Sequence, residues 1–189
     1  MSSTKLLIPS YIQMLRSLSG WLDKAQKQIP VAEAEALLLA RLASDMYPLS
    51  TQVRFACLQA QEAIFRLKGE PIPETLEQVA NEGQNAAEKP GSILDAQTRI
   101  DEALLVLDKL GPDALDAGAE RSITLELPNG MIFDLTGEQY ARDWALPQFY
   151  FHLITAYGIL RNQGIDLGKA DYVPHMFTYL RPGSMPQSQ

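Results

Sequence analysis

The sequence has few of the residues on which several protein classes depend. Its 189 residues include a single cysteine, Cys57, so no disulfide can form within the chain, as is typical of a reducing cytosol. There are only two histidines, His152 and His175. The chain has no cysteine pair at zinc spacing, no glycine-rich phosphate loop after a strand and no G-x-S-x-G motif. These absences argue against a zinc module, a nucleotide-binding loop and a serine hydrolase of the α/β type.

Basic residues and long apolar runs are scarce as well. The chain has 16 basic against 23 acidic side chains, a formal net charge of -7. Because an acidic protein without a basic stripe repels phosphate backbones, we expect no nucleic-acid partner. The apolar stretch Leu6–Ile8 is too short for a signal-peptide core, and no run approaches the length that spans a bilayer. We therefore expect a soluble, cytoplasmic protein without membrane association.

The remaining composition is that of a globular protein with one core. Apolar residues make up 46% of the chain and charged residues 21%, which is unlike a disordered segment. A chain of this length is long enough to bury a real core. We interpret residues 1–189 as one domain, with an irregular tail over 172–189 that is rich in proline.

Apolar residues at helical spacing predict several helices. The first stripe runs from Ile8 to Leu22, with Pro9 suited to a first turn and Pro30 ending the segment. A short helix or turn is expected over 33–44, and a long helix begins near Pro48 and ends at Gly69. The pair Thr75 and Gln78 has the pattern of a capping box, which predicts a short helix over 75–89. The next helix has this predicted inner face: Leu94, Ile100, Leu104, Leu107 and Leu110.

The only clear β pattern precedes the last helix. The segments 123–127 and 131–135 are apolar and flank Pro128-Asn129-Gly130, and Asn-Gly favours a tight hairpin. A second capping-box pair, Thr136 and Gln139, opens a helix that runs to about Asn162. The predicted fold class is therefore mainly all-α: a four-helix bundle with a small β-hairpin inserted before the last helix.

The last helix has the densest set of candidate functional residues. Gln148 and His152 are four residues apart and share one helix face, and Trp144 extends the row. Pro147 removes a backbone donor and crowds the carbonyl of Asp143, so we expect a kink that opens a cavity. The alternative is a buried histidine that bonds to one neighbour, with Pro147 as a tolerated bend.

A second informative stretch is 44–52. Asp45 is expected to cap the following helix, and Gln52 to point inward with Tyr47 or across to His152. Arg54 is expected to stay solvated or to pair with Asp45. Cys57 is interpreted as a small core residue and not as a nucleophile.

Three segments of the chain resemble a known family. Asp45 to Gln52 has the pattern D-x-x-P-L-x-x-Q, Phe149 to Tyr157 has F-Y-F-H-x-x-x-A-Y, and 164–169 adds a third match. These segments resemble an uncharacterised domain family of the DinB/YfiT-like superfamily, which is grouped with metalloenzymes. The likeness covers most of the chain, with an insertion around 81–92. It implies a four-helix bundle that often forms a homodimer.

The resemblance also implies a position for a metal site. Superfamily members commonly bind a divalent metal through three histidines, two of them spaced H-x-x-x-H on one helix. His152 stands where the second would fall, and Gln148, a weak neutral ligand, where the first would. With two histidines in the whole chain we predict no metal and no other cofactor. An irregular divalent-metal site completed by Asp45 or Gln52 is the alternative.

Three functions are compatible with these residues. The first is a metal-free small-molecule pocket in which His152 and Gln148 are catalytic, and Asp45, Gln52, Tyr11, Trp144 and Tyr157 bind the ligand. Its reaction would be that of an isomerase, a lyase or a thiol-linked transferase, because some superfamily relatives carry out thiol-dependent chemistry. The second is a non-catalytic bundle that binds a partner or dimerises. The third is a divalent-metal-dependent hydrolase with a degenerate ligand set.

Overall fold

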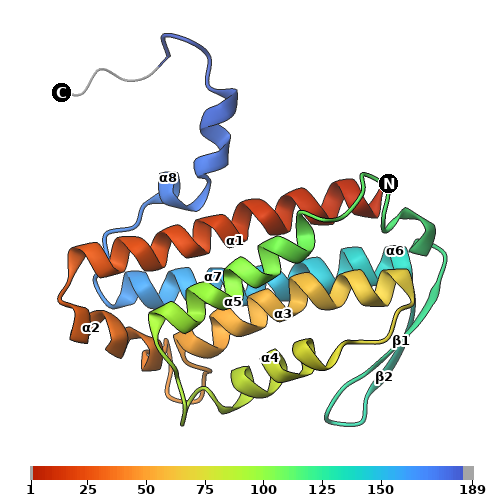
Figure 1. The fold of residues 1–189 in the computed structure, drawn as a ribbon, viewed down its shortest axis with the longest axis horizontal. Coiled ribbons are helices and arrows are strands. Elements are labelled where there is room, and N and C mark those ends of the chain that lie inside the picture. Colours follow the sequence, from red (N-terminus) through yellow and green to blue (C-terminus); the bar gives the residue numbers. More distant parts are fainter. Residues whose placement is uncertain (1, 185–189) are drawn as a thin grey trace.

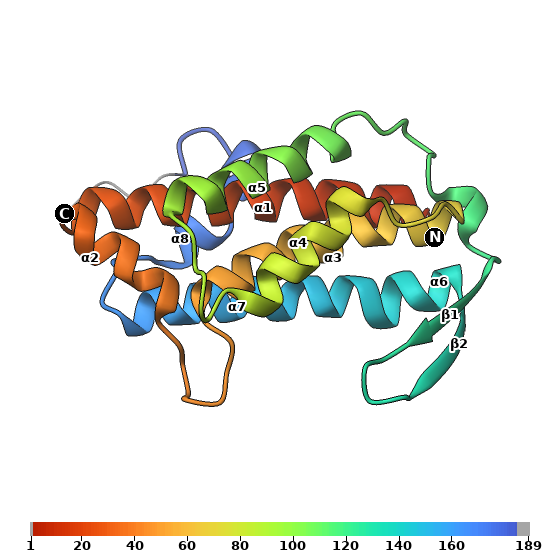
Figure 2. The same cartoon turned by 60° about the horizontal axis from the view of Figure 1, so that its bottom comes forward.

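The computed structural model describes residues 2–184 and shows a bundle of four long helices that lie alongside one another (Figure 1). These are α1 (Ser3–Gln28), α3 (Leu49–Lys68), α5 (Ile93–Leu107) and α7 (Leu146–Asn162). The shorter α4 (Glu74–Asn85) packs on α3, and α2 (Val31–Ala36) with η1 (Leu37–Leu39) follows α1 (Figure 2). The predicted mainly helical fold class, with its hairpin before the last helix, is confirmed.

α1 begins earlier than the position of Pro9 had suggested. The Ser2 side chain accepts a hydrogen bond from the backbone N–H of Lys5, so the helix starts at Ser3 and Pro9 lies inside it. The expectation that Pro9 occupies the first turn is therefore wrong. The carboxylate of Asp116 accepts hydrogen bonds from the backbone N–H and the hydroxyl of Thr4 at 2.9 and 2.8 Å. A distant acidic residue thus satisfies a donor at the helix start and fixes its position.

Two of the predicted helix caps are also wrong. α3 follows Pro48 as expected, but Asp45 is exposed in the preceding loop and makes no cap. α4 starts after Pro73 without a side-chain cap, and Thr75 lies in its first turn. A capping box that was not predicted forms at α5, where Ser92 and Asp95 bond reciprocally. Starting α5 at Ile93 turns Leu94 outward, 73% exposed, and buries Ile93, Ala96, Ile100, Ala103 and Leu107.

The hairpin lies where the Asn-Gly pair predicted it. β1 (Ser122–Glu126) and β2 (Ile132–Thr136) pair antiparallel, with Ser122 opposite Thr136. Gly130 has φ of 84° in the turn, and its N–H donates to the carbonyl of Leu127. The hairpin leans on the bundle through Ile123 and Leu125, which are buried. A two-stranded sheet needs such support.

The three helical segments after β2 follow one another without a gap, although Pro147 lies among them. Thr136 and Gln139 form the predicted capping box at α6 (Gly137–Gln139). A π-helical segment, η3 (Tyr140–Ala145), comes next, and the N–H of Leu146 donates to the carbonyl of Ala141, five residues back. The expected distortion near Pro147 therefore lies just before it, as a wider helical turn.

The C-terminal part contains more regular structure than expected. α8 (Lys169–Tyr172) is followed by the 3-10 helix η4 (Pro174–Tyr179), so an irregular tail from residue 172 is not what the described residues show. In Figure 1, η4 projects away from the bundle. Within residues 2–184, no helix is long and apolar enough to cross a membrane.

Candidate functional site

α3 and α7 bring Gln52 and His152 together inside the bundle. The Nδ1 atom of His152 lies 2.8 Å from Oε1 of Gln52, although the two residues are 100 positions apart. Nε2 of Gln52 donates to the backbone carbonyl of Tyr47 at 3.1 Å. The predicted contact between Gln52 and His152 is therefore present, and Tyr47 takes part in it.

This arrangement fixes the tautomer of His152. The carbonyl of Tyr47 can only accept, so the amide nitrogen of Gln52 must face it and Oε1 must face the imidazole. Nδ1 of His152 therefore carries the proton and donates to Gln52. Nε2 has no hydrogen bond to any residue that the structure describes, so its lone pair can accept one.

Burial keeps the imidazole neutral. Only 7% of His152 is exposed, and this burial lowers the pKa of its imidazole to about 4. The charged form is disfavoured because it would lose its hydration inside the bundle. At neutral pH His152 is thus a hydrogen-bond acceptor, and a weak base.

Aromatic rings surround the histidine. The rings of Phe55 and Phe151 stand edge-on to the imidazole, with centroids 5.2 and 5.3 Å away, and Tyr47 packs against Phe55. Neither phenylalanine was among the residues predicted for this site. Their positions gave a signal, since Phe151 adjoins His152 and Phe55 is three residues beyond Gln52 on the same helix.

The other predicted pocket residues do not gather around His152. Tyr11 is buried in the core against Phe149, and Trp144 packs near Phe133 of the hairpin. Tyr157 contacts Trp21, and its hydroxyl donates to the carbonyl of Leu167. Among the remaining predicted residues, Gln148 is half-buried on α7 and Asp45 is exposed in its loop. The aromatic wall that we predicted from Tyr11, Trp144 and Tyr157 is therefore spread along the bundle.

Cys57 is a core residue, as interpreted from the sequence. It is fully buried on α3, and burial raises the pKa of its thiol to about 12. Because the thiolate is the nucleophilic form, this thiol is unreactive at neutral pH.

The donors near His152 do not fit a divalent-metal centre. Across residues 2–184, no three histidine, cysteine or acidic side chains lie close enough together to hold a metal ion. His175 belongs to η4, which projects from the bundle, and Nδ1 of His152 is already bonded to Gln52 (Figure 1). A stable zinc or similar site needs three or four such ligands.

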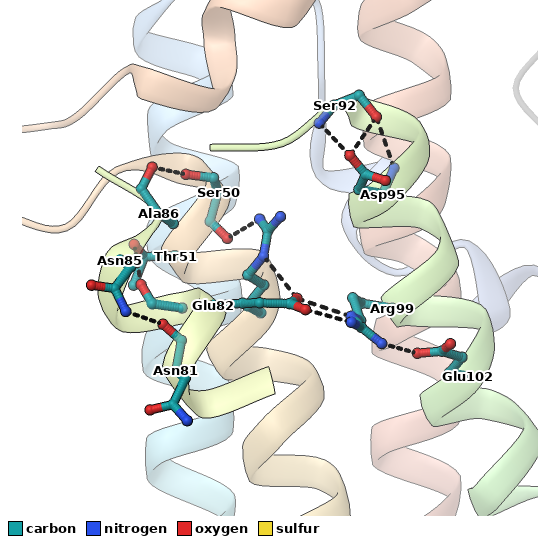
Figure 3. A network of polar contacts seen from close by, with 12 residues as sticks. Ser50, Thr51, Asn81, Glu82, Asn85, Ala86, Ser92, Asp95, Arg99 and Glu102 are labelled. Carbon is teal, nitrogen blue, oxygen red and sulfur yellow. Dashed lines mark hydrogen bonds and ion pairs between the residues drawn. The ribbon is translucent and has the colours of Figure 1, made fainter. Parts of the chain in front are cut away.

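A second polar cluster joins α3, α4 and α5, and the sequence analysis did not predict it (Figure 3). Arg54 is buried and pairs with Glu82, at 3.5 Å, so the expectation that it stays solvated or pairs with Asp45 is wrong. Arg99 also binds Glu82, through two nitrogens, and a third nitrogen binds Glu102. Arg99 is thus the main reason that the pKa of Glu82 lies below its usual value.

Comparison with known proteins gives a family and a fold but no activity. The family model described as "Domain of unknown function (DUF1993)" matches residues 4–173. A crystal structure of a DinB family member protein from Shewanella denitrificans is 28% identical in sequence. It aligns over 98% of this chain and 94% of its own, with a TM-score of 0.70. No curated protein matches the sequence.

Proposed function

The chain belongs to the DUF1993 family of domains of unknown function, and we propose that it is a non-catalytic binding bundle that pairs with a second copy through the outer face of α7. The observation that carries this proposal is that α7 is apolar on both sides. Its inner side is fully buried and contains Phe149, Leu153, Ala156, Ile159 and Leu160. On its outer side Phe151 and Ile154 are 56% and 52% exposed. A helix that is apolar all round is normally covered on all sides.

The outer side of α7 forms a continuous apolar stripe. Phe151, Ile154 and Gly158 are spaced three and four residues apart and therefore share one face. Leu42, from the loop before α3, lies over Gly158, where an added Cβ would be 3.3 Å from its side chain. Tyr47 from the same loop is also exposed. Exposed apolar groups that gather in this way are typical of an interaction surface.

A second copy suits this stripe better than a charged partner. No charged residue occurs between Phe151 and Gly158, so this part of α7 offers no partner for a charged group. In an antiparallel pair of α7 helices around a two-fold axis, Phe151 of each copy would lie against Leu42 and Gly158 of the other. Such an interface is self-complementary, as a symmetric dimer requires. The superfamily resemblance, which implies frequent homodimers, supports the same conclusion.

Sedimentation velocity over a series of protein concentrations tests the pairing. We expect the wild-type chain to sediment as a dimer and Phe151→Glu as a monomer, because each dimer would bury two unpaired charges. Leu94→Glu, at an exposed leucine on α5, is the matched control and should remain dimeric. A monomeric wild type, or a dimeric Phe151→Glu variant with unchanged circular dichroism, would refute the proposal.

A second candidate function is binding of a small molecule at His152, and the fixed tautomer favours it. The free lone pair on Nε2 lies among aromatic rings, so it suits a ligand that carries both a hydroxyl donor and an aromatic ring. An imidazole with a pKa of about 4 is a poor general base at neutral pH. This favours binding over the isomerase, lyase or thiol-linked transferase chemistry that the sequence suggested for His152 and Gln148.

Phenol and anisole together test whether His152 binds a ligand through a hydroxyl group, since only phenol has a hydroxyl donor. We expect phenol to shift the ¹⁵N resonance of His152 Nε2 in a saturable manner, whereas anisole leaves it unchanged. If neither compound moves the resonance, His152 is a structural residue and the binding candidate is rejected.

A further inference from the structure

A buried arginine lines a cavity between α3, α4 and α5. Figure 3 shows Glu82, Asp95, Arg99 and Glu102, which line the same cavity. Arg54 is only 3% exposed, and the cavity that it lines measures about 340 Å³. The other lining residues are Glu82, Asp95, Thr98, Arg99 and Glu102. No residue of α7 lines this cavity, so it is independent of the pairing surface proposed above.

The protein satisfies only part of the hydrogen-bonding capacity of Arg54. Within residues 2–184, its one hydrogen bond runs from Nη1 to the carbonyl of Ser50, at 3.1 Å. Nε is buried without a hydrogen-bond partner, and the nearest carboxylate oxygen, on Glu82, is 3.5 Å away. A guanidinium has five donors, and a buried charge with unmet donors is costly to the fold. Arg54 therefore offers several N–H groups to an acceptor in the cavity.

The carboxylates around the cavity differ in whether their oxygens already accept hydrogen bonds from the protein. Glu82 is held by Arg99 through both of its oxygens, and Glu102 binds another nitrogen of Arg99. Asp95 binds the backbone N–H and the hydroxyl of Ser92 through Oδ2 alone. Its Oδ1 has no hydrogen bond to the rest of the described chain and can accept one from a ligand.

The charges exclude simple ions. Three carboxylates and two guanidinium groups give the lining a net charge of -1, so a phosphate or another multivalent anion would be repelled. A simple cation would leave the hydrogen-bond donors of Arg54 unmet, because it cannot accept a hydrogen bond. Only a molecule that carries both charges complements Arg54 and Asp95 together.

We propose that this cavity binds a small zwitterion, with its carboxylate on Arg54 and its ammonium group on Asp95. The Arg54 guanidinium matches a carboxylate in shape and can donate two parallel hydrogen bonds to it. The cavity has room for a short chain between the two charged ends. The class of ligand is therefore an amino acid or an amino-carboxylic acid of similar length.

Nuclear magnetic resonance of the full chain tests the proposal, with the Arg54 Nε–H signal as the readout. The probes are glycine, β-alanine, γ-aminobutyrate and ε-aminohexanoate, compared with butyrate and butylammonium as the two separate halves. We expect at least one zwitterion to bind saturably and to shift the Arg54 signal. Each half should bind about tenfold more weakly or worse, because it loses one charge-assisted contact.

Three variants test where the ligand binds. Thr98→Trp fills the mouth of the cavity from an exposed position and should abolish binding, whereas Leu94→Trp, exposed on the same helix but outside the lining, should retain it. Asp95→Asn keeps an acceptor for Ser92 but removes the charge, so it should lose the preference for the zwitterion over butyrate. The proposal is overturned if no zwitterion binds, if butyrate binds as tightly as γ-aminobutyrate, or if Thr98→Trp still binds.

Discussion

His152 shows how one buried titratable residue couples this fold to pH. Its imidazole is neutral because the bundle removes its hydration, and the bond from Nδ1 to Gln52 satisfies one of its two nitrogens. In the unfolded chain the same group titrates near its ordinary value of 6.5. The pKa is therefore lower in the folded state than in the unfolded state, and protons bind preferentially to the unfolded chain.

We expect acid to destabilise the protein through His152. As the pH falls from 6.5 to about 4, the unfolded chain gains a proton that the folded chain does not accept, so the free energy of unfolding decreases. The full difference amounts to about 3 kcal/mol. Urea denaturation at pH 7 and at pH 4 should show a smaller decrease in His152→Gln than in wild type. The same substitution at His175 is the matched control, and equal decreases in wild type and His152→Gln would contradict the prediction.

The contacts of an individual side chain could be predicted from the sequence only where the pattern of its own helix indicated that it is buried. The contact between Gln52 and His152 was predictable because each lies on a recognisable helix and each needs a polar partner if buried. The burial of Arg54 was not, since an arginine on a helix is usually solvated and its partner, Glu82, belongs to a helix whose position no local pattern gives. Tyr11, Trp144 and Tyr157 each pack against another aromatic ring, and the sequence does not separate such packing from ligand binding.

At the scale of elements, the sequence predicted which helices form better than where they start. Apolar periodicity reports burial along a whole helix, so the four long helices and the hairpin were found. Helix starts depend on one or two side chains, and here a distant residue, Asp116, satisfies the start of α1. The inner face of α5 begins with Ile93 and Ala96, which are in helical phase with Ile100, whereas Leu94 is not and points outward.

α7 also shows why its outer face was not recognised as a surface. From its sequence, an apolar helix is expected to be buried on every side. The packing of α1 and α3 against α7 shows which side is covered. The exposure of Phe151 and Ile154 is thus a property of the packed bundle. For this reason the family resemblance suggested a dimer, whereas the face that we propose for it emerged only from the packing of the bundle.

At the scale of the whole molecule, Asp171 and Tyr172 bind the C-terminal part of the chain to the bundle, and η4 projects away from it (Figure 1). The indole N–H of Trp21 donates to the carbonyl of Asp171 at 2.8 Å, and Lys24 binds the Asp171 carboxylate. The ring of Tyr172 stacks on Trp21. The side chains of Met176 and Phe177 in η4 are about half exposed, and the family match ends at residue 173.

These contacts predict where the folded unit ends. A chain that stops at Val173 should keep its free energy of unfolding within about 0.5 kcal/mol of the full chain, since every side chain of η4 is exposed except that of His175, which is half-buried. A chain that stops at Ala170 leaves the indole N–H of Trp21 without its partner and removes an aromatic contact, which should cost about 2 to 3 kcal/mol. Urea denaturation followed by tryptophan fluorescence compares the two. If stopping at Val173 is as costly as stopping at Ala170, then η4 belongs to the folded unit, and the predicted domain extends through its tail as one cooperative structure.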